Sequence, residues 1–183
     1  QIAINPQIVK TYASGDIASM SKLVIRGAEY SCYLLLFIGI PIFFFFLFVL
    51  DLWLGQVPEH SVAFMRIIMI ESLFRTMGNP TITAMHATGK MKMLNITVGV
   101  LLLMIIPESF ILFKMGMTPE FVLFVNVIPW ILCIPLRLYW LNKYIDREFP
   151  IGLFLRQVVF KGCVLALVMF VCPFLVSVTI SDD

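Results

Sequence analysis

Three polar side chains recur every four residues inside a long apolar part of this chain. They are Glu71, Arg75 and Asn79, in the stretch "MIESLFRTMGNP". This spacing places them on one line of a helix, where the acid and the base can pair. A charge surrounded by hydrocarbon costs about 2.5–3.5 kcal/mol, so such a line must face protein or water. The pattern predicts either the polar wall of a substrate path or a pair that holds this helix to a neighbour.

A fourth charged residue, Arg66, lies nearer the start of the same helix. It is five residues from Glu71, which places it well off the polar line. Its long side chain can reach a water interface, or its guanidinium can bind a phosphate group. We take Arg66, Glu71, Arg75 and Asn79 as the candidate residues of a substrate path.

Motifs for catalysis, cofactors and metals are absent from the sequence. The segment "ATGK" ends in Lys90 but is followed by Met91 and has no upstream glycine, so it does not match a phosphate-binding loop. The four cysteines form no C-x-x-C pair and lie apart from the two histidines, which argues against a metal site or a disulfide framework. We therefore expect no enzyme, no catalytic residue, no cofactor, no metal and no nucleic-acid partner.

The composition is that of a membrane protein. Hydrophobic residues make up 61% of the 183 residues and charged residues 13%, whereas soluble domains are about 45–50% apolar. The apolar runs are long enough to cross a bilayer. We predict an all-α integral membrane bundle of about five transmembrane helices. The predicted spans are residues 29–50, 62–84, 93–113, 120–141 and 154–178.

Residues 1–28 are more polar, and we predict that they form a cytoplasmic amphipathic helical segment before a transmembrane bundle of residues 29–183. Ten of the thirteen Lys and Arg residues fall on one side of the predicted arrangement, and only Arg66 and Lys114 fall on the other. This bias predicts a cytoplasmic N-terminus and an outer C-terminus. The chain begins with Gln1, and we expect it to be a piece of a longer protein.

Local features predict where the helices begin and bend. Asp16 is expected to cap a long helix that continues to Leu50. Asn126 is expected to form a hydrogen bond between helices. Bends are expected at the residues that disturb helical hydrogen bonding, which are Gly39, Pro41, Pro107, Pro129 and Pro135.

Four segments together resemble a known family. They are "NPQIVKTYASGD" before the first predicted span, "LWLGQVPEHS" after it, "NPTITAMHATGKMK" at the end of the second, and "MGMTPE" before the fourth. In order and spacing they resemble the C-terminal half of bacterial polysaccharide (O-antigen-type) flippases. These flippases belong to the multidrug/oligosaccharidyl-lipid/polysaccharide exporter superfamily, and the resemblance covers nearly the whole chain.

The resemblance implies a two-lobe transporter of about 12–14 spans in the bacterial cytoplasmic (inner) membrane. It would move undecaprenyl-diphosphate-linked oligosaccharide to the outer leaflet for polysaccharide or lipopolysaccharide biosynthesis. The implied partners are this lipid-linked oligosaccharide, the lipid bilayer and the remainder of the same transporter. The resemblance gives no role to single residues, so Arg75 and Arg66 are chosen by depth and charge alone.

Two other functions remain open from the sequence. One is a cation-coupled multidrug exporter of the same superfamily. The other is a structural membrane subunit, in which Glu71 and Arg75 only stabilise helix packing. A membrane-embedded glycan enzyme is disfavoured, because the predicted outer loops are too short to hold a catalytic site.

Overall fold

The structure of this chain is a computed structural model that describes residues 4–167. All regular elements in this range are helices, as predicted. In chain order they are α1 (Asn5–Ala13), α2 (Ile17–Phe44), α3 (Phe46–Leu54), α4 (Ser61–Thr88), α5 (Lys92–Leu103), α6 (Ile105–Lys114), α7 (Pro119–Val125), α8 (Val127–Tyr144), α9 (Ile151–Phe154) and the π-helix η1 (Leu155–Phe160). Helix continues after η1 to residue 167.

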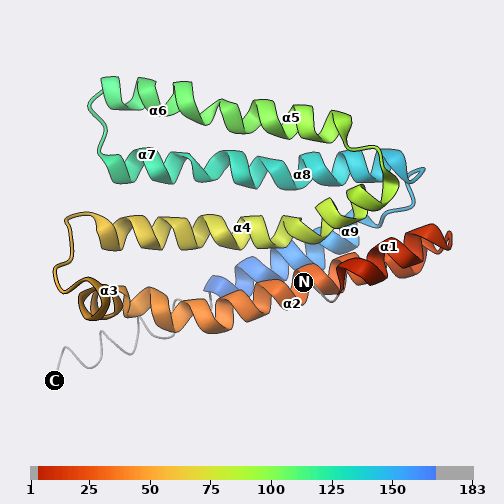
Figure 1. Cartoon of the computed structure of the whole chain (residues 1–183), viewed down its shortest axis with the longest axis horizontal. Helices are drawn as coiled ribbons and strands as arrows, with labels where there is room; N and C mark the ends of the chain where they lie inside the picture. The colour runs from red at the N-terminus through yellow and green to blue at the C-terminus, as the bar shows by residue number, and fades with distance from the viewer. Residues whose placement is uncertain (1–3, 168–183) are drawn as a thin grey trace.

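The long helices lie side by side in one layer (Figure 1). In spatial order they are α2, then α4, then α7 with α8, then α5 with α6. Helix α1 packs on α2 and α4, and η1 packs on α2. Helix α4 therefore lies inside the layer, with α2 on one side and α8 on the other, whereas α5 and α6 form an edge.

Within residues 4–167, three helices are long enough and apolar enough to cross a membrane. They are Ile17–Phe44, the continuous stretch Lys92–Lys114, and the continuous stretch Pro119–Tyr144. Helix α4 has 28 residues, as α2 does, but its composition is too polar for this group. The second predicted span is thus a helix of sufficient length, and part of the fifth, residues 168–178, lies outside the described residues.

Asp16 begins α2, as predicted. Its carboxylate accepts a hydrogen bond from the backbone N–H of Ser19 at 2.9 Å, which is the usual role of an N-cap. Hydrogen bonds from Ser19 lower the pKa of Asp16 below its usual value. The predicted continuation to Leu50 is wrong, because α2 ends at Phe44 and the chain bends at Phe45. Helix α3 then turns away and is seen end-on in Figure 1.

Two of the predicted proline bends are helix interruptions. Helix α5 ends just before Met104, three residues ahead of Pro107, and α7 ends just before Asn126, three residues ahead of Pro129. Proline has no N–H to bond the carbonyl four residues earlier, so the helical ladder breaks there. Pro135 lies inside α8 without an interruption.

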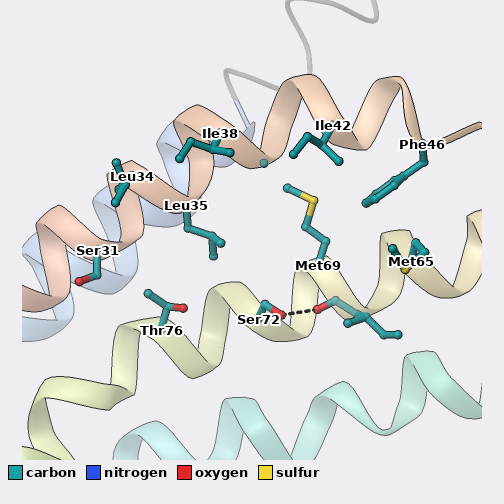
Figure 2. Close-up of a pocket in the computed structure, with 12 residues that line it drawn as sticks. Ser31, Leu34, Leu35, Ile38, Ile42, Phe46, Met65, Met69, Ser72 and Thr76 are labelled. Carbon is teal, nitrogen blue, oxygen red and sulfur yellow. Dashed lines mark hydrogen bonds between the residues drawn. The ribbon is translucent and has the colours of Figure 1, made fainter. Parts of the chain in front are cut away.

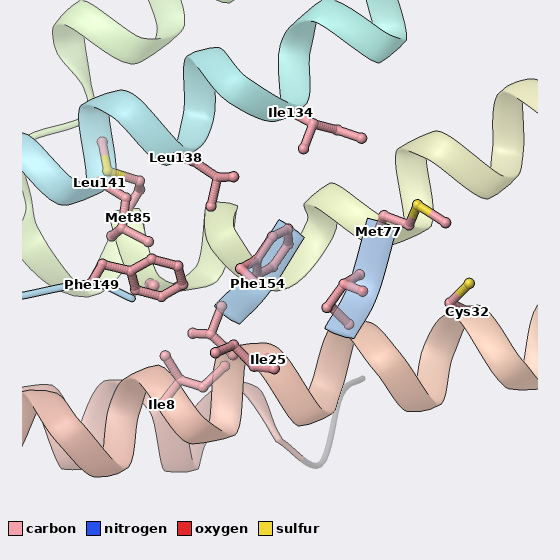
Figure 3. Packing of buried hydrophobic residues seen from close by; sticks show 14 of the residues in the cluster. Ile8, Ile25, Cys32, Met77, Met85, Ile134, Leu138, Leu141, Phe149 and Phe154 are labelled. Atoms are coloured by element: carbon pink, nitrogen blue, oxygen red, sulfur yellow. The ribbon is translucent and has the colours of Figure 1, made fainter. Parts of the chain in front are cut away.

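The core joins the N-terminal segment to the rest of the bundle. Ile8 of α1 and Phe154 of α9 are fully buried, and Figure 3 shows them with Met85 of α4 and Leu138 of α8 around one apolar centre. Helix α2 passes through residue 28 without a break. The first 28 residues therefore contribute to the packed bundle from residue 4 onward, rather than standing apart from it.

Candidate functional site

Glu71 and Arg75 are paired on α4, as their spacing predicts. Glu71 Oε1 lies 3.8 Å from Arg75 Nη1, and the two side chains are 24% and 55% exposed within this chain. At this distance the contact is a loose ion pair and not a close hydrogen bond. Glu71 alone therefore does not hold Arg75 in place.

Trp130 of α8 provides the second contact of Arg75. The guanidinium carbon lies 4.7 Å from the centre of the Trp130 ring, within the range of a cation–π interaction, which contributes about 0.5–2 kcal/mol. Arg75 thus contacts Glu71 on its own helix and Trp130 on the neighbouring helix. Arg75 therefore places a positive charge at the α4–α8 contact, and its contact with Trp130 joins the two helices.

The other two candidate residues lie apart from this pair. Arg66 is exposed, and its guanidinium lies 5.3 Å from the ring centre of Phe43 at the end of α2. Asn79 is half-buried next to Gly78. Within the part of the chain that the structure describes, the Asn79 side chain forms no hydrogen bond. The structure therefore brings Glu71 and Arg75 together, but it does not join Arg66 to them.

Arg137 of α8 is the residue that the sequence prediction missed. It is only 6% exposed, and its Nη1 lies 2.6 Å from the position that a Cβ atom on Gly78 would occupy. The guanidinium therefore lies directly on the backbone of α4, in space that only glycine leaves free. Among residues 4–167, no carboxylate lies within 4.0 Å of Arg137 and no hydrogen-bond partner is present.

A weak sequence signal for Arg137 exists. It follows Trp130 by seven residues, which is two helical turns, so both side chains lie on the same face of α8. The sequence alone does not show that this face of α8 meets α4, because the contact joins two helices that are far apart in the chain. The sequence prediction counted Arg137 among the cytoplasmic cations at the end of its span.

Arg75, Arg137 and Glu71 form a site with a net positive charge at the α4–α8 contact, which we call the cationic site. Arg137 packs on Gly78, which lies one helical turn from Arg75 on the same face of α4, and the single carboxylate neutralises only one of the two arginines. A buried charge without a partner costs several kcal/mol. Two guanidinium groups with one nearby carboxylate are chemically suited to bind an anion such as a phosphate group.

An apolar groove lies on the opposite side of α4, between α4 and α2 (Figure 2). Its volume is about 530 Å³. Its lining is mostly aliphatic and sulfur-containing side chains such as Leu35 and Met69, with three hydroxyl residues, Ser31, Ser72 and Thr76. The Ser72 hydroxyl donates to the Ile68 carbonyl of its own helix at 2.8 Å. The groove is therefore suited to hold hydrocarbon.

In the described part of the chain, no group of three or more His, Cys, Asp or Glu residues could hold a metal ion. The cationic site and the apolar groove are the two features next to α4 that could bind a substrate. Comparisons of this chain with protein-family models, with curated proteins and with solved structures gave no match.

Proposed function

We propose that this chain is part of a membrane transporter that moves an anionic, lipid-linked substrate across a bilayer. The observation that carries the proposal is the cationic site, in which Arg137 is buried between helices α4 and α8 and no carboxylate of residues 4–167 is its partner. A stably buried cation of this kind is costly unless an anion binds it. The site lies among helices of membrane-spanning length.

The membrane placement follows the prediction of about five spans, with α4 as the polar one. Ionisable residues in a membrane face the inside of a bundle or a water-filled cavity, because lipid cannot solvate them. Helix α4 meets this condition on two sides, since α2 and α8 flank it. The exposed half of the Arg75 side chain would face a water-filled cavity or the remainder of the transporter.

The substrate that fits both features is undecaprenyl-diphosphate-linked oligosaccharide, the substrate of the flippases that the sequence resembles. Its diphosphate would bind Arg75 and Arg137. Glu71 would position Arg75, and its loose 3.8 Å contact would let the guanidinium turn to the phosphate. The apolar groove between α2 and α4 would take part of the polyprenyl chain. The protein would act in the bacterial cytoplasmic membrane together with the remainder of the transporter.

A cation-coupled multidrug exporter of the same superfamily is the second candidate. The observation that favours it is the size and apolar character of the α2–α4 groove, which also suits an apolar drug. Export that depends on a proton or sodium gradient, without any polyprenyl glycan, would identify this function.

Substitution of Arg75 tests the leading proposal. In the full-length transporter, Arg75→Ala should lower the amount of glycan that reaches the outer leaflet while membrane insertion is retained. Lys114→Ala is the control, because Lys114 is an exposed cation at the end of α6, outside both the cationic site and the apolar groove. Wild-type glycan export by Arg75→Ala would contradict the role of this site in transport.

A further inference from the structure

The contact between α2 and the α9–η1 segment has two chemically different ends. The two segments run in the same direction. At the far end of their contact, Lys161 Nζ, just after η1, lies 3.9 Å from Glu29 Oε1 of α2. The Tyr33 hydroxyl donates a hydrogen bond to the same oxygen at 2.8 Å. At this end, acid and base are matched across the contact.

Toward the N-terminal ends of the two segments, a cavity of about 240 Å³ separates them. It is lined by Lys22, Ile25 and Arg26 of α2 and by Leu153 and Gln157 of the α9–η1 segment. Both cations are exposed. Among the described residues, no carboxylate lies within 4.0 Å of either one. The same pair of segments is therefore charge-matched at one end and carries only positive charge beside the cavity.

Lys22 and Arg26 are one helical turn apart, so they lie on the same face of α2. Lys22 is within electrostatic range of Asp16 at the start of the helix, but this single exposed acid does not compensate both cations. Lys22 is the sixth residue of a helix long enough to span a membrane. It is thus placed at the level where a membrane helix meets the lipid headgroups.

The surface next to the cavity is apolar. Leu153, which lines the cavity, is exposed, and Leu155 and Phe160 are exposed farther along the same α9–η1 segment. A ligand that fits this place has an anionic group for the two cations and hydrocarbon for the leucines. Gln157 adds an amide that can donate a hydrogen bond to a phosphate oxygen. A free phosphate ion would satisfy the cations but would leave the apolar surface uncovered.

We propose that this cavity binds the headgroup phosphate of an anionic phospholipid, between Lys22 and Arg26 of α2 and Gln157 of η1. The acyl chains lie along the exposed side chains of Leu153 and its neighbours. The bound lipid then links α2 to the α9–η1 segment at the end where the Glu29–Lys161 pair does not. The site requires the membrane placement given under the proposed function, but not the identity of the transported substrate.

The test is lipid retention by the full-length transporter, measured by native mass spectrometry after detergent exchange with phosphatidylglycerol or phosphatidylcholine. The wild-type protein should retain phosphatidylglycerol preferentially. A cation near an anionic lipid contributes about fivefold to binding, so Lys22→Gln/Arg26→Gln should lower retention about twenty-five-fold. Lys10→Gln/Lys92→Gln is the matched control, since both lysines are exposed and lie outside the cavity lining. Its retention should remain within twofold of wild type.

Three outcomes would overturn the lipid site. They are wild-type retention by the double variant, equal retention of phosphatidylcholine, and displacement of the lipid by millimolar inorganic phosphate. If the double variant does not fold, the single variants Lys22→Gln and Arg26→Gln, each expected to lose about fivefold, provide the same test. Glycan export is measured in parallel, so that the two proposals are tested separately. A variant that loses lipid retention but exports glycan normally would support the lipid site and leave the proposed transport function unaffected.

Discussion

Gly78→Ala is the substitution that most directly probes how the cationic site is built. An added Cβ at Gly78 would lie 2.6 Å from Arg137 Nη1, whereas ordinary contacts begin at 3.4 Å. The guanidinium must therefore move by about 0.8 Å from its place on α4 to reach an ordinary contact distance. In the proposed site this displaces one of the two cations that bind the substrate.

The expected change in stability is the difference of two opposing effects. Alanine inside a helix is more favourable than glycine by about 1 kcal/mol. Overpacking of a well-filled contact costs about 1–3 kcal/mol. The free energy of unfolding should therefore fall by about 0–2 kcal/mol, and glycan export should fall because Arg137 no longer occupies its position.

Gly99→Ala is the control for this comparison. Gly99 lies within helix α5, and nothing stands within 4 Å of a Cβ added there. It should gain up to about 1 kcal/mol in unfolding free energy, with unchanged export. Unfolding in detergent micelles and glycan export in cells are measured for both variants. If Gly78→Ala gained as much stability as Gly99→Ala and exported glycan at the wild-type level, the packing of Arg137 against α4 would be refuted.

Three further experiments test helix packing outside the cationic site. Phe154→Ala removes a fully buried side chain and should lower the unfolding free energy by about 3–5 kcal/mol; a loss below 1 kcal/mol would show that α9 is not docked. Asn126→Ala removes the 3.2 Å hydrogen bond from Nδ2 to Ser109 Oγ and should lower the unfolding free energy, measured by thermal unfolding, by about 0.6 kcal/mol. In a protein that already carries Ser109→Ala, the same substitution should have no further effect. A double-mutant cycle with Glu29→Gln and Lys161→Gln should give a coupling below about 1 kcal/mol, because Lys161 is about half exposed and exposed pairs contribute little; a larger coupling would contradict this.

Features that depend on neighbours in the chain could be predicted from the sequence. Asp16 caps α2 because a carboxylate at that position reaches the third following N–H, and this is local geometry. The interruptions ahead of Pro107 and Pro129 have an equally local cause. The pairing of Glu71 with Arg75 follows from helical spacing. The hydrogen bond of Asn126 to Ser109 also confirms a prediction, although the partner could not be named.

Features that depend on which helices meet could not be predicted. Arg137 was placed among interfacial cations because its span ends a few residues later. Its burial depends on Gly78, 59 positions earlier in the chain, and no local pattern joins the two. For Arg75, helical spacing predicts the contact with Glu71 but not how much of the side chain is covered, and 55% of it is exposed within this chain. The ring that covers it, Trp130, again comes from another helix.

The N-terminal segment shows a similar limit. Its mixed composition predicts a cytoplasmic amphipathic helical segment but does not show what covers the apolar face. In the structure, α1 folds against α2 and α4 and buries Ile8 completely, and Thr83 of α4 donates a hydrogen bond to Asn5 Oδ1 at 3.2 Å. An amphipathic pattern indicates that one face is covered, but it does not indicate whether lipid or protein covers it.

Arg137→Met in the full-length transporter tests the central claim most directly, with stability and glycan export measured on the same variant. Methionine fills similar space without a charge, so relief of the buried cation should leave the unfolding free energy unchanged or raise it by about 1–4 kcal/mol. Arg156→Met, at an exposed cation, serves as the control with normal export. The cationic site predicts a stable Arg137→Met protein that exports little or no glycan. A variant that exports glycan at the wild-type level would contradict it.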